Sequence, residues 1–482
     1  MREYLTQAKK LAEKIIKYDD ILIVSHIDAD GITSAAIASS ALDSIGKNHK
    51  VIFLKQLDPG TLDEIKKNNS QLYWFTDLGS GMVHEMHGMN VIITDHHSPS
   101  DLIPVVPKEK RKTLTDLFEE ISKDDILQLN PHLFGKDGGI DISGAGVTYL
   151  VARELNSKNV NLSPLAIVGA VGDLQDIAFL KLAGTNRYIL KEAEEFGLLK
   201  VEIDARFFGR ETRPVYKMLE YVSDPILPNI TGDERGAIEF LKNLSIPLKD
   251  GENWRRWVDL TKDEKRKILS SLVKNIITSG YGSIMAERMI GEVYTLIKEE
   301  EGTYLRDAKE FATLLNACGR YGDAITGFRV AKGDRDVEYR KAVGLLQRHR
   351  KIILDGIDYL KDIGINKMQH LQYFNAGSNI PDTVIGTIAS IILSSGIADP
   401  SLPIIGFADN EYGTIKVSGR APRSLIEKGL DLSRAIREAA IAVGGNGGGH
   451  NVAAGGSIPR GREIEFVEIL DTIIKRQLGS VV

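Results

Sequence analysis

Residues 21–31 read Ile-Leu-Ile-Val-Ser-His-Ile-Asp-Ala-Asp-Gly, a stretch in which an apolar run turns polar within one residue. The apolar residues 21–24 predict a short buried strand, and the Ala-, Ser- and Ile-rich residues 32–42 predict a helix after it. An open α/β sheet places its functional groups where strands end before helices. Asp28 and Asp30 lie two residues apart, so an extended backbone would point both side chains the same way. Two such charges favour a cation between them, although a solvated turn with a helix-capping Asp would use the same residues.

The composition is that of a globular protein, with 43% hydrophobic and 26% charged residues among 482. This length predicts two to four domains. The net charge of -5 would repel a polyanion, so any nucleic-acid contact must come from local basic patches. A single cysteine, Cys318, excludes an intrachain disulfide and suits a reducing compartment. The N-terminus lacks an apolar secretory signal and the sequence has no long apolar window, so we expect a cytoplasmic protein without a membrane span.

Further short apolar runs predict more strands, among them residues 72–76 and 91–94. Acidic or imidazole side chains follow these runs at once: Asp77 after the first, Asp95, His96 and His97 after the second, and Asp173 after a later buried run at 165–171. Because short strands alternate with helices, we predict an α/β fold with a parallel, doubly wound sheet. The strand ends would then meet at one edge of that sheet.

The pattern divides the chain into four predicted segments. They are an α/β domain at 1–190, a mainly helical insertion at 191–305, a connector at 306–360 with an Arg320-bearing turn and a long basic helix, and a smaller α/β domain at 361–482. The insertion is assigned from its Lys-, Glu- and Leu-rich helical periodicity and its few strand signals. Two tryptophans in it could stack bases, or belong to a core or a protein interface.

The polar groups expected at the edge of the first sheet suit a metal site: His26, Asp28, Asp30, Asp77, Asp95, His96, His97 and Asp173. Carboxylate oxygens together with imidazole nitrogens match Mn²⁺ or Mg²⁺ better than a thiolate-seeking ion. Four converging aspartates would carry a charge of about −4, which two divalent ions balance. Two ions about 3.5–4 Å apart can activate a water and stabilise both oxygens of a phosphoryl displacement.

These motifs resemble those of the DHH phosphoesterase superfamily. Residues 25–31, Thr76-Asp77, residues 95–97 and Asp173 are similar to its four ordered motifs, and Gly447-Gly-Gly-His450 is similar to the signature of the DHH-associated C-terminal domain. The resemblance covers residues 20–180 and 314–456 and says little about the insertion.

Further details resemble the RecJ branch of single-strand exonucleases. They are the HxDADG form of the first motif, Asn130-Pro131 ahead of Gly144-Ala-Gly-Val147, and Asn316-Ala-Cys-Gly-Arg320. The sequence is most similar to the archaeal RecJ-like group, also called GINS-associated nuclease. That resemblance implies a catalytic lobe and a C-terminal lobe with a cleft between them.

The resemblance also implies a role for each residue. The metal ligands would be Asp28, Asp30, Asp77, His96 and Asp173, with Asp77 bridging two ions. His26 would ligate or support the first ion, His97 would contact the scissile phosphate, and Asp95 would orient the neighbouring imidazoles. For the two adjacent histidines, the alternative is core packing or a surface turn.

A second set of residues is expected to hold the substrate: Arg320, Arg420, Gly447, Gly448, Gly449 and His450. A glycine-rich loop frees backbone N–H groups to approach a phosphate, although such a run can also be a flexible turn. By resemblance, Arg320 would grip the nucleic-acid backbone; the alternative is a surface ion pair.

The resemblance therefore implies a hydrolase: a two-metal-dependent, single-strand-specific exonuclease that releases mononucleotides in the 5′→3′ direction during DNA replication or repair. Mn²⁺ would be favoured, with Mg²⁺ as the second candidate. The partners would be single-stranded DNA, with RNA as a further candidate, and the GINS replication complex. Three alternatives remain open at this point. They are a 3′→5′ exonuclease on DNA or RNA, a phosphodiesterase for short oligonucleotides or cyclic dinucleotides, and a replication scaffold that binds GINS.

Overall fold

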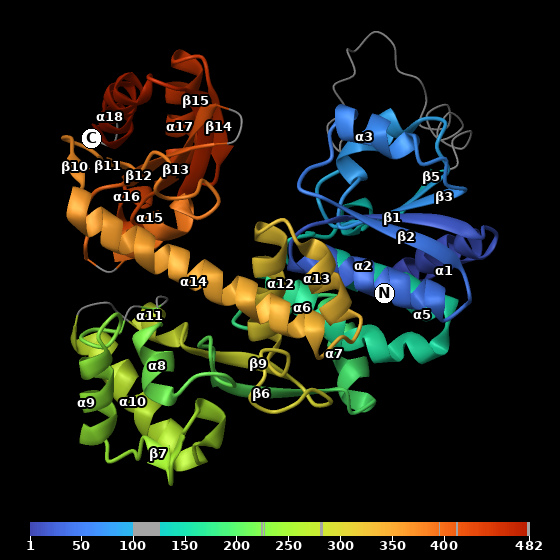
Figure 1. Cartoon of the computed structure of the whole chain (residues 1–482), viewed down its shortest axis with the longest axis horizontal. Helices are drawn as coiled ribbons and strands as arrows, with labels where there is room; N and C mark the ends of the chain where they lie inside the picture. Colours follow the sequence, from blue (N-terminus) through green and yellow to red (C-terminus); the bar gives the residue numbers. More distant parts are fainter. Residues whose placement is uncertain are drawn as a thin grey trace. The chain divides into compact units, whose positions relative to one another are not determined.

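The computed structural model describes residues 1–99, 126–222, 225, 227–279, 283–394, 396–410 and 413–479. The chain divides into two compact units, the first formed by residues 1–219 and 238–346 and the second by residues 220–237 and 347–482. Figure 1 colours the elements in chain order. Among the described residues, we find no helix with both the length and the hydrophobicity that crossing a bilayer requires.

A five-stranded sheet forms the centre of the first unit, in the order β2-β1-β3-β4-β5 with every neighbouring pair parallel. Its strands are β1 (Asp20–His26), β2 (Asn48–Leu54), β3 (Leu72–Thr76), β4 (Val91–Thr94) and β5 (Ile126–Leu129). The predicted parallel sheet is thus confirmed. Because β2 and β3 lie on opposite sides of β1, the strand order reverses between β1 and β3. The carboxyl ends of such strands are where open α/β sheets bind ligands.

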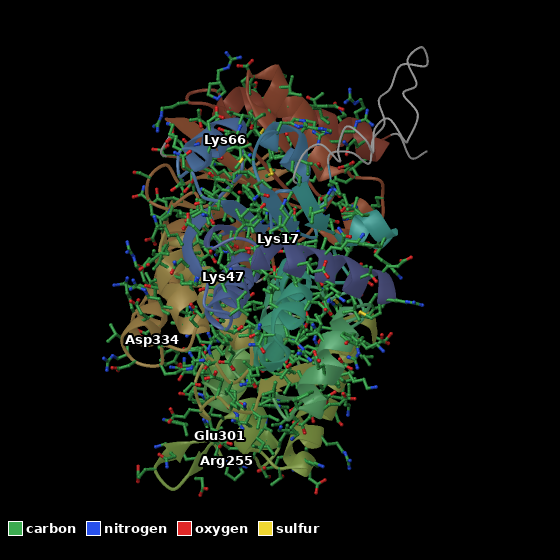
Figure 2. All side chains as sticks on the ribbon, turned by 90° about the vertical axis from the view of Figure 1, so that its right-hand side faces the viewer. Lys17, Lys47, Lys66, Arg255, Glu301 and Asp334 are labelled. Carbon is green, nitrogen blue, oxygen red and sulfur yellow. The ribbon has the colours of Figure 1, made fainter. Side chains whose placement is uncertain are left out.

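Helices cover both faces of this sheet (Figure 1). They are α1 (Arg2–Ile16), α2 (Ala29–Asp43), α3 (Pro59–Lys66) and α5 (Gly144–Leu155). Helix α6 (Ser163–Gly172) packs on α2 and α5, and α7 (Asn186–Glu195) packs on α6. Successive β3 residues show the two faces, since Trp74 packs in the core with α1, α2 and α5, whereas Phe75 packs in the core under α3. Charged side chains extend outward instead, as Lys17 and Glu301 do (Figure 2).

The segment at 191–305, predicted as a mainly helical insertion, contains helices and also two longer strands near its ends. Strands β6 (Leu199–Ala205) and β9 (Ile290–Leu296) pair antiparallel over all seven residues. The intervening elements are α8 (Val215–Glu220), α9 (Glu234–Asn243), β7 (Lys249–Asp250), β8 (Asn253–Trp254), α10 (Lys262–Thr278) and α11 (Ser283–Glu287). In β6, apolar residues alternate with charged ones, and this strand signal is easily missed inside a charged, helix-rich segment.

Buried charges join the insertion to the rest of the first unit. The Arg210 guanidinium, only 3% exposed as a residue, donates to Asp307 at 2.9 Å and to Asp204 at 3.0 Å. Asp204 also accepts from Lys265 at 2.8 Å and from the Trp257 indole at 2.9 Å. Each buried carboxylate therefore has a cation beside it, which buried charges require.

Three helices follow the insertion: α12 (Ala308–Arg320), α13 (Ala324–Ala331) and α14 (Val337–Ile363). The expected long helix is present, but the expected Arg320-bearing turn is not, because α12 continues to Arg320. A glycine inside the motif suggested the turn. Gly319 instead serves a close approach, since a Cβ there would lie 1.7 Å from the carbonyl oxygen of Ile27.

The second unit contains a six-stranded mixed sheet in the order β10-β11-β12-β13-β15-β14. Its strands are β10 (Asn366–Lys367), β11 (Gln372–Asn375), β12 (Ile404–Asp409), β13 (Thr414–Arg420), β14 (Asn446–Gly449) and β15 (Ala453–Pro459). Helices α17 (Leu432–Ala442) and α18 (Glu463–Gly479) share one core with the sheet and α15 (Ile385–Ser394) shares another; the remaining helix is α16 (Arg423–Ile426). The predicted glycine-rich loop is partly wrong, since Gly447–Gly449 form the edge strand β14.

Candidate metal centre

The loop between β1 and α2 is compact. Asp28 is the N-cap of α2, and its carboxylate accepts a hydrogen bond from the backbone N–H of Gly31 at 2.9 Å. Only glycine fits at position 31, because a Cβ there would lie 2.2 Å from the carbonyl oxygen of His26. The His26 imidazole contacts Asp28, with Nδ1 and Oδ2 2.9 Å apart. Burial lowers the pKa of His26, but the Asp28 carboxylate outweighs this effect and raises it.

Asp30 is separated from Asp28 by the start of α2, so the two do not lie on one extended strand as expected. The Asp30 carboxylate, 2% exposed as a residue, accepts from the backbone N–H groups of Gly144 at 2.7 Å and Ala145 at 2.9 Å. These groups open α5, whose N-terminus favours a negative charge. The two aspartates therefore face different neighbours.

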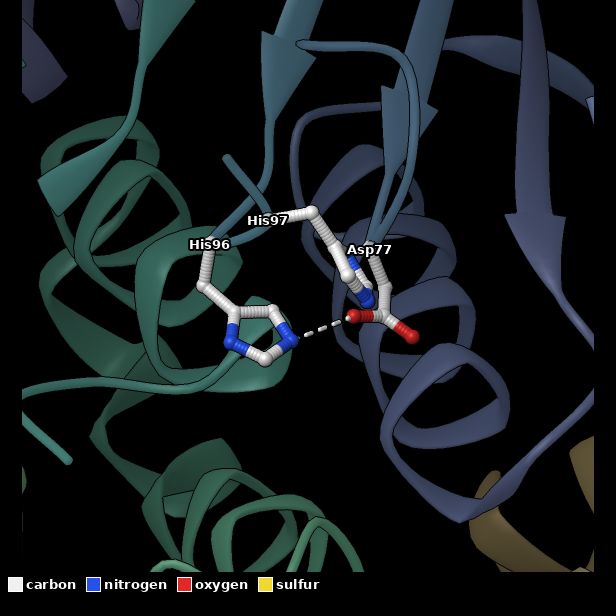
Figure 3. A group of neighbouring side chains, drawn as sticks. All are labelled: Asp77, His96 and His97. Atoms are coloured by element: carbon white, nitrogen blue, oxygen red, sulfur yellow. Dashed lines mark ion pairs between the residues drawn. The ribbon is translucent and has the colours of Figure 1, made fainter. Parts of the chain in front are cut away.

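Asp77 follows β3 in a left-handed conformation, with φ of +59°. The residue is 1% exposed, yet neither carboxylate oxygen has a hydrogen-bond partner among the residues that the structure describes. It forms ion pairs with the Nε2 atom of His96, 3.2 Å from Oδ1, and the Nδ1 atom of His26, 3.7 Å from Oδ2. Burial and the charge of Asp30 raise the pKa of Asp77 well above 3.8. Figure 3 shows the Asp77 carboxylate facing the His96 ring, with the His97 side chain beside it.

Asp95 organises the loop after β4. It is fully buried and accepts hydrogen bonds from the backbone N–H groups of Ser80 (3.0 Å), His96 (2.7 Å) and His97 (3.1 Å), and from the His97 ring at 2.8 Å. Burial raises the pKa of Asp95, but the bonds from His97 outweigh it and lower the pKa to about 2. The hydrogen bond to Asp95 in turn raises the pKa of His97, whose side chain stays 58% exposed. Asp95 thus orients an accessible imidazole.

His96 points in the opposite direction. Its Nδ1 atom lies 2.9 Å from the carbonyl oxygen of Gly138, which fixes the ring and leaves Nε2 facing Asp77 and Asp30. The Gln175 amide bonds both this carbonyl and the Asp173 carboxylate, each at 2.9 Å. Burial and Asp30 raise the pKa of Asp173 to about 6.

The structure gathers these side chains into three groups of possible metal ligands: His26, Asp28 and Asp77; Asp77, His96 and His97; and Asp30, His96 and Asp173. The ligand atoms in each group lie within 4.8 Å of one another. Asp77 and His96 each belong to two groups. The side chains fit divalent cations, because the donors are oxygen and imidazole nitrogen and the buried Asp77 oxygens otherwise lack partners.

Asp95 is absent from these ligand groups in the part of the chain that the structure describes, in keeping with its expected orienting role. Sequence reasoning missed the residues that hold the ligands, Gln175 and Gly138. Gln175 carried a signal, since it lies two residues after Asp173.

The residues expected to bind substrate are divided between the two units. In the first unit, Arg320 is the last residue of α12, one position after Gly319 and its contact with Ile27. In the second unit, the Arg420 guanidinium at the end of β13 donates to Ser390 Oγ and to the carbonyl oxygen of Gly419, both at 2.8 Å.

The glycine strand also belongs to the second unit. Gly447, Gly448 and Gly449 pair with Gly456, Gly455 and Ala454 of β15. His450 is exposed and begins the hairpin turn that joins the two strands. β14 is the edge strand of its sheet, and the Arg437 side chain donates to the Gly447 carbonyl oxygen at 3.3 Å.

Three family models match the chain in order. They are the DHH family N-terminal domain at residues 20–169, the DHH-CID domain at 207–290 and the DHHA1 domain at 368–476. The second match falls between β6 and β9.

Curated relatives match at the sequence level, and two of them illustrate the range. An uncharacterised protein of Methanocaldococcus jannaschii is 31% identical over 484 residues, covering 99% of each chain. The single-stranded-DNA-specific exonuclease RecJ of Bacillus subtilis is 25% identical over 210 residues, which cover 38% of this chain and 24% of that protein.

Solved structures share the fold. RecJ from Thermus thermophilus in complex with Mn²⁺ matches with a TM-score of 0.55 and 20% identity, over 98% of this chain and 55% of that chain. CDC45 from Entamoeba histolytica matches with a TM-score of 0.62 and 14% identity, over 98% and 99%. At these identities the likeness describes the fold alone.

Proposed function

Because this chain belongs to the DHH family as a RecJ-like, metal-dependent hydrolase of phosphodiester bonds, we propose that it is an exonuclease that degrades single-stranded nucleic acid from the 5′ end. The observation that carries the proposal is Asp77. Its buried carboxylate lacks hydrogen-bond partners among the described residues and belongs to two of the ligand groups. A carboxylate in that position is suited to bridging two divalent ions.

Two ions held by these groups would supply an activated water and would neutralise charge on the phosphate. Asp28 and His26 would hold one side of the centre, and Asp30 and Asp173 the other, with Asp77 between them. Because imidazoles contribute alongside the carboxylates, we favour Mn²⁺ over Mg²⁺.

His97 is the residue we assign to the scissile phosphate. Its ring is exposed and its Nδ1 side is engaged by Asp95, so the Nε2 side is available to a substrate. The Asp95 carboxylate favours the protonated ring, which would donate to a phosphate oxygen as negative charge develops there.

We assign substrate binding to Arg320 in the first unit and to Arg420, the glycine strand and His450 in the second. Arg420 uses two of its donors within its own unit, and a guanidinium fixed in this way is preorganised for a phosphate. Arg420→Ala should therefore raise KM more than it lowers kcat. The reverse split would move Arg420 into the chemical step.

Single-strand preference is supported by the RecJ relative, whose name specifies single-stranded DNA. A role in DNA replication or repair is a further part of the proposal. A further candidate role is a contact with the GINS replication complex, which the motif resemblance to the GINS-associated nuclease group implies. A scaffold without catalysis is disfavoured, because the ligand groups are intact. Pull-down with purified GINS tests the contact, and the absence of binding would remove it.

Labelled oligonucleotides test the nuclease proposal. DNA and RNA strands carrying the label at the 5′ or the 3′ end are incubated with Mn²⁺, Mg²⁺ or EDTA, with Asp77→Asn as the inactive control. We expect labelled mononucleotides at once from 5′-labelled single strands, and no cleavage in EDTA. Immediate release of labelled mononucleotides from 3′-labelled strands would show 3′→5′ cleavage instead. Turnover restricted to dimers and trimers, or to cyclic dinucleotides, would favour the small-substrate phosphodiesterase.

A further inference from the structure

Asn316 reaches the metal-binding loop from a distant helix. Its Oδ1 atom accepts a hydrogen bond from the backbone N–H of Ala29 at 2.8 Å, across a sequence separation of 287 residues. Ala29 is fully buried and lies between Asp28 and Asp30, which belong to different ligand groups. The bond therefore holds the peptide that links the two groups.

The start of α2 explains why this bond is needed. The first N–H groups of a helix have no acceptor within the helix. Ile32 is the first residue of α2 to find one, at the carbonyl oxygen of Asp28, and the Gly31 N–H uses the Asp28 side chain. Burial keeps water away from the Ala29 N–H, so this group needs an acceptor within the protein. The Asn316 side chain provides that acceptor.

The backbone of α12 is seated against the same loops. Gly319 allows contact with the carbonyl oxygen of Ile27, and Ala312 lies close to Gly172, the residue before Asp173, since a Cβ at position 172 would be 3.3 Å from it. Packing thus fixes the helix that carries Asn316 against the loops that carry ligands on both sides of the centre.

We propose that Asn316 is a positioning residue for the metal centre, one that fixes the peptide between Asp28 and Asp30 so that each carboxylate faces its own ion. This inference rests on the proposed function. Groups that orient metal ligands typically change metal affinity or activity 10–100-fold when removed. The carboxamide acts through the Ala29 N–H, its hydrogen-bond partner in the described part of the chain.

Titration calorimetry with Mn²⁺ tests the inference. Asn316→Leu keeps the side-chain volume and removes the acceptor, whereas Asn316→Asp keeps an acceptor at the same position. Thr313→Val is the matched control, because Thr313 lies on the same helix and its hydroxyl bonds only the α12 backbone, at Lys309. We expect Asn316→Leu to bind Mn²⁺ about 10–100-fold more weakly, and the other two variants to stay close to wild type.

A second readout separates positioning from a general loss of structure. At saturating Mn²⁺, the kcat of Asn316→Leu should recover while KM for the oligonucleotide stays unchanged. Should this variant fail to fold by circular dichroism, Asn316→Ser repeats the test, since its hydroxyl is too short to replace the carboxamide oxygen. Equal Mn²⁺ affinity in wild type and the acceptor-free variant would overturn the inference alone. Absence of Mn²⁺ binding by the wild-type protein would overturn the proposed function as well.

Discussion

In the metal-free protein, the buried Asp77 carboxylate should lower the free energy of unfolding. Asp77→Asn should therefore raise it. A buried polar group without partners costs about 1–3 kcal/mol, and an amide can donate to the surrounding carboxylates. Asparagine also tolerates the left-handed backbone at this position, where φ is +59°. We therefore expect the free energy of unfolding in EDTA to rise by about 1–3 kcal/mol, seen as a higher Tm.

Mn²⁺ should reverse this order. A ligand present at about 100 times its Kd stabilises the folded state by about 2.7 kcal/mol, and Asp77→Asn should lose most of that gain. Differential scanning calorimetry in EDTA and in Mn²⁺ measures both effects.

Asp30→Asn is the matched control of opposite sign. Both oxygens of Asp30 accept backbone hydrogen bonds, so an amide would leave a buried N–H of Gly144 or Ala145 without an acceptor. This variant should lose about 1–3 kcal/mol in EDTA. If Asp77→Asn were also less stable than wild type in EDTA, the free-energy cost assigned to the buried Asp77 carboxylate would be refuted.

Three further results are expected. Asp95→Asn should lower the pKa of His97, measured by NMR, and slow cleavage about 10–100-fold, because the ring loses its carboxylate partner; an unchanged pKa would contradict this role. Burial raises the pKa of Glu310 to about 7, so the native state holds its proton more tightly and stability should fall as pH rises from 4.5 to about 7. Urea unfolding across this pH range should show that the free energy of unfolding depends less steeply on pH in Glu310→Gln than in wild type. Equal slopes would argue against this role of Glu310. Gly319→Ala should abolish cleavage or folding, whereas Gly344→Ala, with open space around it in α14, should raise the free energy of unfolding by about 0.5–1 kcal/mol.

The parallel sheet, and the acidic and imidazole side chains that gather at its edge, could be predicted from the sequence because both depend on which residues follow each short apolar run. Each short apolar strand leads directly into its polar residues, as at β3 and Asp77. The spatial division of the ligands could not be predicted in this way. An extended backbone was assumed for residues 28–30, but the N-terminus of α5 supplies donors that draw Asp30 into a different group.

Interactions between distant segments account for the other differences. A turn was predicted around Gly319 and Arg320. The local sequence does not show that Gly319 lies against Ile27 inside a helix. The glycine run at 447–449 has no side-chain pattern of its own, and only pairing with β15 makes it a strand. Asn316 likewise shows its importance only where α12 meets the buried N–H of Ala29.

The pairing of β6 with β9 means that the chain departs at Ala205 and returns opposite it at Ile290. A module spliced into a protein at two adjacent points can be lengthened, shortened or exchanged without displacing its host. Here such an exchange has a condition attached, because Arg210 lies inside the module and neutralises Asp204 and Asp307 outside it. A different segment inserted between β6 and β9 must therefore contain a cationic side chain that pairs with Asp204 and Asp307. Otherwise these two aspartates must be substituted as well.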